Sequence, residues 1–349
     1  MKEINLDGRL IGKNHPPFLV AEMSGNHNQS LERALEIVEA AAKAGADAVK
    51  IQTYTADTMT LDETKQDFMI KDSNSLWHDK SLYALYKEAY TPWEWHEPIF
   101  NRCKELGMLA FSSPFDETAV DFLESLEVPC YKIASFENND IPLIKKVATT
   151  GKPIIISTGM ATVAELEESV KAAHESGSRD IILLKCTSTY PASPENTNIK
   201  TIPHMRELFN VQVGLSDHTL GSGVAVASVA LGTTLVEKHF TLSRADGGVD
   251  AAFSIEPDEM KSLALSLKQA WLALGNVKYG PTSAEKSSLK FRRSIYIAKN
   301  VKQGDSLTKD NLRVIRPGYG LSPKYYEQLL GSKVNQDLKA GTPLLWDYL

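Results

Sequence analysis

The sequence is poor in cysteine and lacks long apolar runs. Its three cysteines, Cys103, Cys130 and Cys186, have no paired spacing, and each lies in or beside an apolar segment. This pattern excludes a disulfide framework and predicts reduced core residues in a cytoplasmic protein. No run of about 18 apolar residues occurs, and the polar start MKEINLDGRLIG lacks the apolar centre of a signal peptide. We therefore expect no membrane-spanning segment.

Basic tracts and glycine-rich nucleotide loops are also missing. The net charge is −6, with 38 basic and 44 acidic residues spread along the chain. Without a basic tract, nucleic acids and anionic membranes are poor candidates as partners. The missing glycine-rich loop argues against kinase or dinucleotide chemistry. An anionic small molecule stays possible as a substrate, because local lysines can outweigh a mildly acidic surface.

Eight short apolar runs alternate with helical patterns. The runs are FLVAEMS (18–24), AVKIQTY (48–54), MLAFSSP (108–114), YKIASFE (131–137), PIIISTG (153–159), IILLKCTS (181–188), VGLSDH (213–218) and TLVEKHF (234–240). Such near-continuous runs are typical of parallel strands that are buried on both faces. Eight of them, alternating with helices, favour an α/β fold of the (β/α)8 barrel type over residues 1–278.

Three segments fall outside this repeat. Thr55–Gly107 separates the second and third strands and is rich in aromatic residues, so it either covers the substrate or forms an extra packed helical hairpin. Residues 279–290 have the composition of a polar linker. Residues 291–349 carry short strands broken by turn residues, which predicts a small β-rich domain. A domain of this size is marginal alone, so we expect it to dock on the barrel or on that of a partner subunit.

Polar residues occur where nearly every predicted strand ends. They are Glu22, Ser24, Lys50, Gln52, Ser112, Ser113, Lys132, Ser135, Glu137, Ser157, Thr158, Thr187, Ser188, Tyr190, Ser216, Asp217, His218, Glu237 and His239. Any one of them could be a barrel-lining residue with satisfied hydrogen bonds. Buried polar groups are costly unless they have partners or a function, so the set as a whole predicts an active site at this end of the barrel.

His218 and His239 end two consecutive strands. A lone histidine on an apolar strand is more often a packed core residue, but two at equivalent strand ends can converge on one point. Neutral imidazoles that converge suit a divalent metal ion, with carboxylate, water or substrate oxygen as the remaining ligands. The remaining histidines in loops and helices, among them His96 and His174, are interpreted as structural.

Lys50 and Lys132 lie on otherwise buried strands. A buried ammonium group needs a counter-charge, and no acidic residue close by in the sequence supplies one. We therefore expect an anionic substrate, with nearby serine hydroxyls donating hydrogen bonds to phosphate or carboxylate oxygens. A Schiff-base lysine is the alternative interpretation.

The order of motifs resembles the sialic acid synthase family. The segments that carry the resemblance are AEMSGNHNQS, AVKIQTY, YKIASFE, STGM, LLKCTSTYPA, GLSDHT and EKHF in the barrel, and FRRS, QGD, IRPGYG and AGTPL after it. Members of that family join a (β/α)8 barrel to a C-terminal antifreeze-like (SAF) domain. QTYTADTMTLD, LYKEAYTPWEWH and IASFENND are similar to the branch that makes pseudaminic acid.

The resemblance implies a reaction. Phosphoenolpyruvate would condense with the open-chain aldehyde of an amino sugar, with a divalent ion (Mn²⁺, or Mg²⁺ or Co²⁺) on His218 and His239. Glu22 and Glu137 would be the acid/base residues. The residues implied for phosphoenolpyruvate are Lys50, Ser113, Lys132, Ser135, Ser157, Ser188 and Ser216. Gln52, Tyr190 and Asp250 would face the sugar.

The resemblance also implies a homodimer with exchanged SAF domains, in which Phe291 and Arg316 reach the active site of the other subunit. For a trideoxy sugar, Met23, Tyr54, Phe136, Trp93 and Trp95 are predicted to supply apolar surface. Three alternatives stay open: a legionaminic or neuraminic acid synthase, a barrel metallohydrolase, and a non-catalytic sugar-binding or regulatory barrel.

Overall fold

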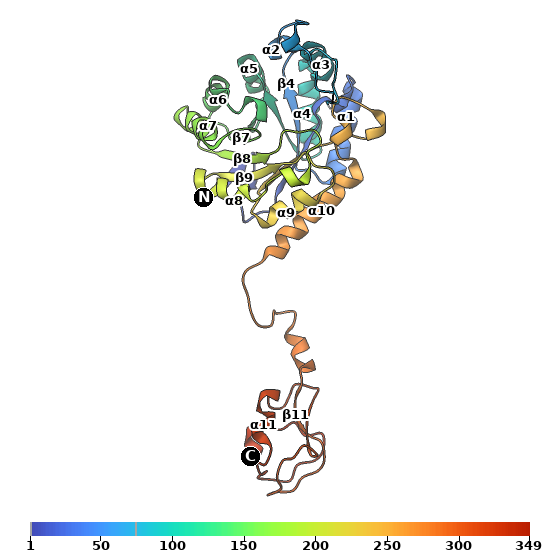
Figure 1. Cartoon of the computed structure of the whole chain (residues 1–349), viewed down its shortest axis with the longest axis vertical. Coiled ribbons are helices and arrows are strands. Elements are labelled where there is room, and N and C mark those ends of the chain that lie inside the picture. Colours follow the sequence, from blue (N-terminus) through green and yellow to red (C-terminus); the bar gives the residue numbers. More distant parts are fainter. Residues whose placement is uncertain (1, 74) are drawn as a thin grey trace. The chain divides into compact units, whose positions relative to one another are not determined.

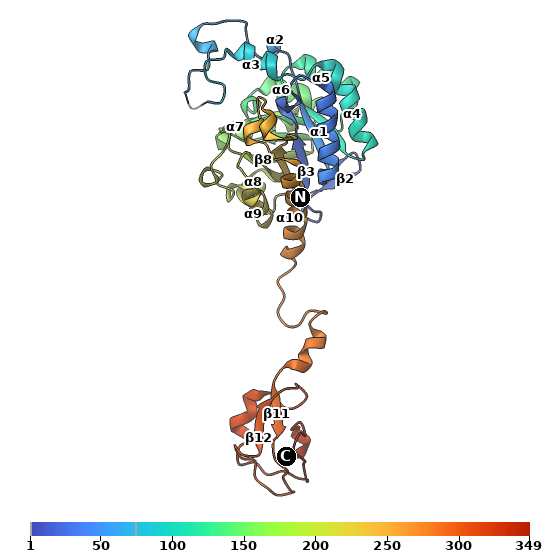
Figure 2. The same ribbon diagram turned by 90° about the vertical axis from the view of Figure 1, so that its right-hand side faces the viewer.

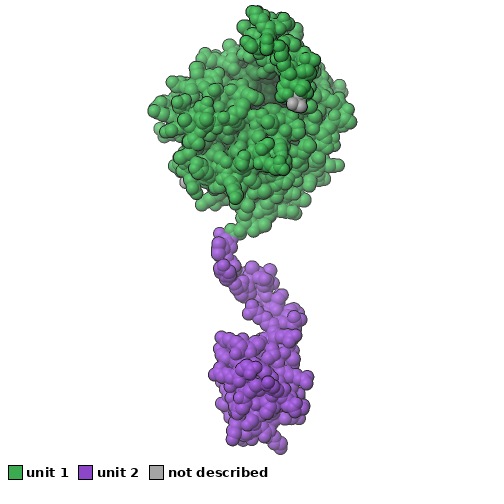
Figure 3. Space-filling view, in the orientation of Figure 1, with its two compact units in different colours: residues 1–275 green, residues 276–349 purple. Residues whose placement is uncertain are grey.

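The computed structural model describes residues 2–73 and 75–349. The chain divides into two compact units, Met1–Gly275 and Asn276–Leu349, which Figure 3 shows in separate colours. Each unit has its own apolar core. We therefore describe the two units separately.

The first unit is a closed barrel of eight parallel strands, as the sequence predicts (Figure 1). The strands are β3 (Phe18–Glu22), β4 (Ala48–Thr53), β5 (Leu109–Pro114), β6 (Tyr131–Ile133), β7 (Ile154–Ser157), β8 (Ile181–Cys186), β9 (Gln212–Ser216) and β10 (Leu235–His239). They follow one another around the barrel in chain order, and β10 pairs with β3 to close it.

Helices follow the strands and surround them. They are α1 (Leu31–Ala44), α4 (His96–Glu105), α5 (Glu117–Ser125), α6 (Ile141–Ala148), α7 (Val163–Glu175), α8 (Thr201–Phe209), α9 (Gly223–Ala230) and α10 (Pro257–Leu274). Their ends follow local chemistry: Ser30 accepts a hydrogen bond from the Arg33 amide at the start of α1, and Thr162 and Glu165 form a capping box on α7. The strand–helix alternation is therefore encoded locally.

The amino-terminal end of the barrel interior is apolar. Val20, Ala48 and Phe111 pack there against a short hairpin of β1 (Ile4–Leu6) and β2 (Arg9–Ile11). Asp7 and Gly8 connect its strands in the left-handed conformation, as a tight hairpin turn requires. The hairpin was not expected from the polar N-terminal sequence, although Asp-Gly is a strong hairpin signal.

The barrel interior becomes polar toward the carboxyl ends of the strands. Side chains alternate between the two faces of a strand, so on β10 Leu235, Glu237 and His239 point inward while Lys238 points outward. On β4, Ala48, Lys50 and Gln52 are the inward residues by the same rule. The polar strand ends found in the sequence therefore meet at one end of the barrel.

The insertion between β4 and β5 contains two additional helices, α2 (Ala56–Met59) and α3 (Leu82–Ala89). They contact each other, and Figure 2 shows them together at one end of the barrel. The last part of the insertion is α4, which packs on α1 and β5 as an ordinary barrel helix. The additional material is thus confined to the first part of the insertion.

The second unit contains one antiparallel pair, β11 (Ser294–Ile297) with β12 (Leu312–Ile315), several isolated bridges, and the short helix α11 (Tyr326–Leu329). Its core is formed by apolar residues such as Ile295, Leu312 and Leu344. The predicted small β domain is present, with more irregular backbone than the sequence suggested. In the part of the chain that the structure describes, no helix is long and apolar enough to cross a membrane.

Candidate active site

A cavity of about 480 Å³ opens at the carboxyl ends of the barrel strands. The predicted site residues that line it are Glu22, Lys50, Gln52, Lys132, Ser135, Glu137, Ser157, Ser188, Tyr190, Ser216, His218, His239 and Asp250. Ser113 lies directly behind them, with its hydroxyl 3.4 Å from Lys50 Nζ. Phe291 and Arg316 belong to the second unit. The barrel thus brings together the predicted residues that lie on its strands and loops.

Two lysines and two glutamates form the buried floor of the cavity. Lys50 Nζ lies 2.9 Å from Glu22 Oε2 and 3.4 Å from Glu237 Oε1, and Lys132 Nζ lies 3.4 Å from the same Glu237 oxygen. The expectation that these lysines lack a protein counter-charge was wrong. Barrel closure places β10 beside β3, which brings Glu237 to residues far from it in the sequence.

Burial and charge act against each other in this cluster. Burial raises the pKa of Glu22, and only part of that effect is offset by Lys50. For Glu237, burial also acts to raise the pKa, but Lys132 and Lys50 together lower it. Burial and the nearby Lys50 lower the pKa of Lys132, whereas Glu22 and Glu237 raise that of Lys50 above its usual value despite burial. The cluster is formally neutral, with two cations and two anions.

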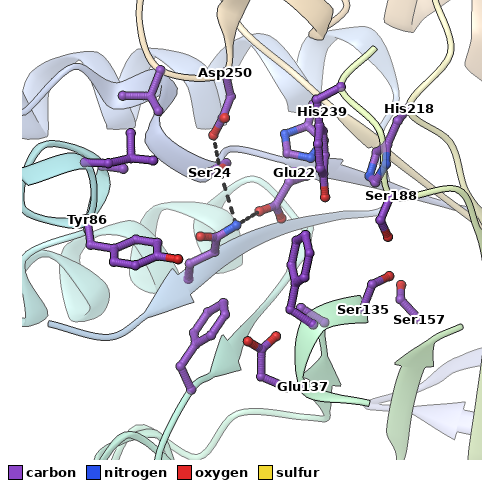
Figure 4. A pocket seen from close by; sticks show the side chains of 18 of the residues that line it. Glu22, Ser24, Tyr86, Ser135, Glu137, Ser157, Ser188, His218, His239 and Asp250 are labelled. Atoms are coloured by element: carbon purple, nitrogen blue, oxygen red, sulfur yellow. Dashed lines mark hydrogen bonds between the residues drawn. The ribbon is translucent and has the colours of Figure 1, made fainter. Parts of the chain in front are cut away.

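His218 and His239 project into the cavity side by side (Figure 4). Their ring centroids are 5.3 Å apart, and Tyr190 packs on both rings. The His218 Nδ1–H donates to the Thr187 carbonyl at 2.9 Å, which leaves Nε2 as the free lone pair. Burial lowers the pKa of His239 well below its usual value, so this imidazole is neutral.

These features suit a divalent metal ion. A ligand histidine must be neutral and must have one nitrogen free, and His239 Nδ1 is buried with no hydrogen-bond partner in the described part of the chain. Among the described residues, no group of three or more His, Cys, Asp or Glu could enclose an ion. The protein would therefore supply two ligands, and water or substrate would supply the others.

Glu137 faces the histidines from the other side of the cavity, where β6 ends (Figure 4). Burial raises the pKa of its carboxyl to about 7. Its Oε2 has no hydrogen-bond partner among the described residues. A carboxyl group with these properties can change its protonation state near neutral pH, as general acid–base catalysis requires.

Three serine hydroxyls line the cavity between Glu137 and the histidines. Ser157 accepts a hydrogen bond of 2.7 Å from Lys132 Nζ, and Ser135 accepts one of 3.2 Å from the Gly159 amide. A Cβ atom at Gly159 would lie 2.0 Å from the Ser188 hydroxyl and 2.6 Å from that of Ser135. The glycine therefore makes room for a group of hydroxyls that can bind an anion.

A chain of hydrogen bonds crosses the opposite wall. Gln52 Nε2 donates to Glu22 Oε1 at 3.0 Å and to Ser24 Oγ at 3.1 Å, and Ser24 donates to Asp250 Oδ2 (Figure 4). The Gly25 amide also donates to Asp250 at 3.2 Å. These bonds orient Gln52 and Asp250, both predicted to face the sugar. Burial raises the pKa of the Asp250 carboxyl.

The mouth of the cavity has an apolar wall that comes largely from the insertion. Its residues are Met59, Ile70, Trp77, Leu82, Leu85, Tyr86, Ala89, Phe115 and Val249. Trp77 Nε1 donates to the Val249 carbonyl at 3.0 Å and so connects the insertion to the segment after β10. This arrangement favours the interpretation that the insertion covers the substrate.

Of the apolar residues predicted for the sugar, only two line the cavity. Tyr54 and Phe136 line the cavity. Met23 lies in the barrel core, Trp93 stacks on Phe122, and Trp95 contacts His27 edge-to-face. The sequence shows that the segment is aromatic, but the direction of each ring depends on how the insertion folds back.

Two site residues received no role from the sequence. Glu237 could have been identified from the sequence, because it lies two residues before His239 on one strand and so shares its inner face. Cys186, predicted as a reduced core residue, lines the cavity with Sγ 3.9 Å from His218 Nδ1. Burial would raise the pKa of this thiol, but His218 beside it lowers the pKa to about 6.

Comparison with known proteins agrees with this geometry. Residues 37–279 match the NeuB family and residues 292–349 match the SAF domain. The chain is 45% identical to the pseudaminic acid synthase of Campylobacter jejuni over 94% of this chain and 95% of that protein, and 43% identical to that of Helicobacter pylori over 95% and 97%. The crystal structure of the N-acetylneuraminic acid synthetase of Leptospira borgpetersenii superposes with a TM-score of 0.73 at 30% identity, covering 83% of this chain and 96% of that one. This chain therefore belongs to the NeuB family and ends in a SAF domain.

Proposed function

We propose that this chain is a pseudaminic acid synthase, a carbon–carbon bond-forming transferase. It condenses phosphoenolpyruvate with 2,4-diacetamido-2,4,6-trideoxy-L-altrose and water, and it releases pseudaminic acid and phosphate. The observation that carries the proposal is one cavity that combines a lysine–serine floor, a histidine pair and an apolar mouth. The identity to two pseudaminic acid synthases over nearly the whole chain supports the choice of sugar.

Phosphoenolpyruvate is assigned to the floor of the cavity. Lys50 and Lys132 provide positive charge, and the hydroxyls of Ser113, Ser135, Ser157, Ser188 and Ser216 provide hydrogen bonds for its carboxylate and phosphate oxygens. Because Glu22 and Glu237 already neutralise the two lysines, the arriving anion competes with them for the ammonium groups. The serine hydroxyls then contribute a large share of the binding.

The sugar is assigned to the upper part of the cavity. Gln52, Tyr190 and Asp250 hold its polar groups, and Tyr54, Phe136 and the apolar wall of the insertion contact its methyl and acetamido groups. A divalent ion on His218 and His239, which we propose is Mn²⁺ with Mg²⁺ or Co²⁺ as substitutes, would polarise the aldehyde. The C3 carbon of phosphoenolpyruvate then forms a bond to the aldehyde carbon.

Water must next add to the C2 carbon of the condensed molecule. The water loses one proton as its oxygen bonds to C2, and the aldehyde oxygen gains one proton to become a hydroxyl. Glu137 is the proposed base for the water, because its carboxyl has a pKa of about 7. Glu22 is the second acid/base candidate. The bond between C2 and the phosphate-ester oxygen then breaks, the leaving phosphate takes up the proton that the C2 hydroxyl gives up, and the 2-keto acid remains.

We further propose that the protein works as a homodimer in the cytoplasm. The SAF domain would serve the barrel of the other subunit, with Phe291 and Arg316 at its active site. Both side chains are exposed within their own unit, which leaves them free to contact another surface. The cytoplasm is the compartment where phosphoenolpyruvate is produced, and the three cysteines are unpaired.

Phosphate release from phosphoenolpyruvate tests the proposal. The trideoxy altrose sugar, its legionaminic-type counterpart and N-acetylmannosamine are offered in parallel with Mn²⁺, with and without EDTA, and products are identified by mass spectrometry. The proposal expects EDTA-sensitive release with the altrose sugar. Preferred turnover of another sugar would overturn the substrate but keep the chemistry, and no release with any sugar would favour a non-catalytic sugar-binding barrel.

Histidine variants provide the internal control. His218→Ala should abolish turnover, whereas His174→Ala on the outer helix α7 should leave it unchanged. Metal-dependent turnover in His218→Ala would refute the metal assignment. Hydrolysis of a substrate without phosphoenolpyruvate would instead favour a barrel metallohydrolase.

A further inference from the structure

An ion pair between Asp217 and Lys238 lies directly behind the two histidines. Asp217 precedes His218 at the end of β9, and Lys238 precedes His239 on β10. Lys238 is 1% exposed and Asp217 2% exposed. Because neighbouring residues of a strand point to opposite faces, both side chains point away from the cavity that the histidines enter. Neither belongs to the described cavity lining, so a direct contact with substrate is not their role.

The lysine holds both neighbours of His218. Lys238 Nζ donates to Asp217 Oδ2 at 2.9 Å and to the Thr219 carbonyl at 2.5 Å. Asp217 Oδ1 in turn accepts from the Thr219 amide at 3.0 Å and from its hydroxyl at 2.7 Å. One ammonium group, on the residue next to His239, therefore fixes the chain immediately before and immediately after His218.

In the described part of the chain, backbone hydrogen bonds do not join the two segments at the position of His218 and His239. The pairing of β9 with β10 reaches Ser216 and Glu237, and the Asp217 amide donates to the Glu237 carbonyl at 2.9 Å. Beyond that bond, the segment after β9 and the end of β10 form backbone hydrogen bonds with other parts of the chain. The His218 carbonyl accepts from the Ala192 amide, and the Phe240 amide donates to the backbone carbonyl of Glu22 on β3. The contacts of Lys238 join the two segments where the backbone pairing has ended.

Stability alone is a weak explanation for this pair. A buried ion pair loses its hydration, and its replacement by apolar groups of similar volume is often neutral or stabilising for folding. Groups that orient metal ligands without touching the metal, in contrast, typically change metal affinity about 10–100-fold. Lys238 precedes one candidate ligand, His239, and bonds the residues on both sides of the other, His218, so its position suits the orientation of metal ligands.

We infer that Lys238 and Asp217 are positioning residues that set the separation and orientation of His218 and His239 for a divalent metal ion. The inference rests on the proposed function, because it needs the histidine pair to be a metal site. It predicts that removing the pair weakens metal binding while the fold and the phosphoenolpyruvate floor stay intact.

Direct metal binding tests the inference. The loss of the free Mn²⁺ signal in electron paramagnetic resonance gives the Mn²⁺ dissociation constant of the full chain without any substrate. The double variant Asp217→Asn/Lys238→Met removes both charges at nearly constant volume, so it leaves no unpaired buried ion. The matched control is Glu124→Gln/Lys152→Met, which removes another ion pair, with an N–O distance of 2.6 Å, in the outer layer of the barrel.

Lys238→Arg is the second variant, because it keeps Asp217 paired and protects folding. The wider guanidinium cannot place one nitrogen against both Asp217 and Thr219 as the ammonium does. Circular dichroism and the melting temperature identify folded variants. Phosphoenolpyruvate binding is measured separately by calorimetry without metal.

The expected result is that folded variants at Lys238 bind Mn²⁺ at least about tenfold more weakly than wild type, while the control and phosphoenolpyruvate binding change less than about twofold. Folded variants that bind Mn²⁺ as wild type does would overturn the inference and leave the proposed function standing. A wild-type chain that binds no Mn²⁺ would overturn the metal assignment itself.

Discussion

Replacing Glu137 by glutamine should alter both the pH dependence of the reaction and the stability of the fold. Burial raises the pKa of this carboxyl from 4.5 to about 7. If its ionised form accepts the proton of water, the active fraction is about one tenth at pH 6, half at pH 7 and nine tenths at pH 8. The wild-type rate should therefore rise about fivefold from pH 6 to 7 and less than about twofold from pH 7 to 8.

The ionisation of Glu137 affects folding stability in the opposite direction to the rate: stability falls as pH rises. A folded-state pKa above the unfolded value means that the folded protein binds the proton more tightly, so stability is full below pH 4.5 and falls as pH rises through about 7. The shift corresponds to about 3 kcal/mol at pH 8, as an upper estimate for a partly exposed carboxyl. Glu137→Gln should therefore raise the melting temperature at pH 8 and leave it nearly unchanged at pH 4.

The assay is kcat/KM for the sugar between pH 5.5 and 9, at saturating phosphoenolpyruvate, combined with thermal unfolding. Glu137→Gln should lower the rate about 10²–10⁴-fold and remove the rise near pH 7. Glu97→Gln, a change of an exposed carboxylate on α4, is the control. A wild-type rate that is flat from pH 6 to 8, or a rise that persists in Glu137→Gln, would refute the assignment of Glu137 as the base.

Three further predictions concern the rest of the site. Gly159→Ala should raise KM for phosphoenolpyruvate about tenfold or more, because its Cβ would displace the Ser188 and Ser135 hydroxyls that are proposed to bind this anion. Gly223→Ala has open space around its Cβ and should behave as wild type; equal kinetics for both variants would contradict the anion site. His239→Ala should lose Mn²⁺ binding as well as turnover, measured by electron paramagnetic resonance and phosphate release, and retained binding would argue against a two-histidine site. Mixing inactive His239→Ala with inactive Arg316→Ala should restore about a quarter of wild-type activity if SAF domains are exchanged between subunits, and no recovery after subunit exchange would speak against a shared site.

The barrel and most of its functional end could be predicted from the sequence. The eight apolar runs have the length and continuity of parallel strands, and each ends in polar residues at the point where a barrel places its active site. The histidines are visible for the same reason, since His218 and His239 end consecutive strands. These features depend on order along the chain, and the sequence shows that order directly.

The partners of the lysines could not be predicted in this way. Glu237 meets Lys50 and Lys132 only because the last strand closes against the first, and the meeting depends on a register that no local pattern encodes. The apolar wall has the same origin. Trp77 and Tyr86 reach the cavity because the insertion folds back over it, whereas Trp93 and Trp95, equally prominent in the sequence, turn into the protein.

The hydrogen bonds that join Gln52, Ser24 and Asp250 along one wall of the cavity all have a defined donor and acceptor. Both hydrogens of its amide are engaged, one by Glu22 and one by Ser24, and the Ser24 hydroxyl passes its own hydrogen to Asp250. The chain of donors thus ends on two carboxylates, those of Glu22 and Asp250, and because both amide hydrogens of Gln52 are used, its carbonyl oxygen is the atom that can accept a hydrogen bond from a ligand. The wall consequently selects a ligand by polarity. A hydroxyl or amide N–H of a ligand can donate a hydrogen bond to that oxygen, whereas a ligand carbonyl oxygen in the same place would be repelled by its lone pairs.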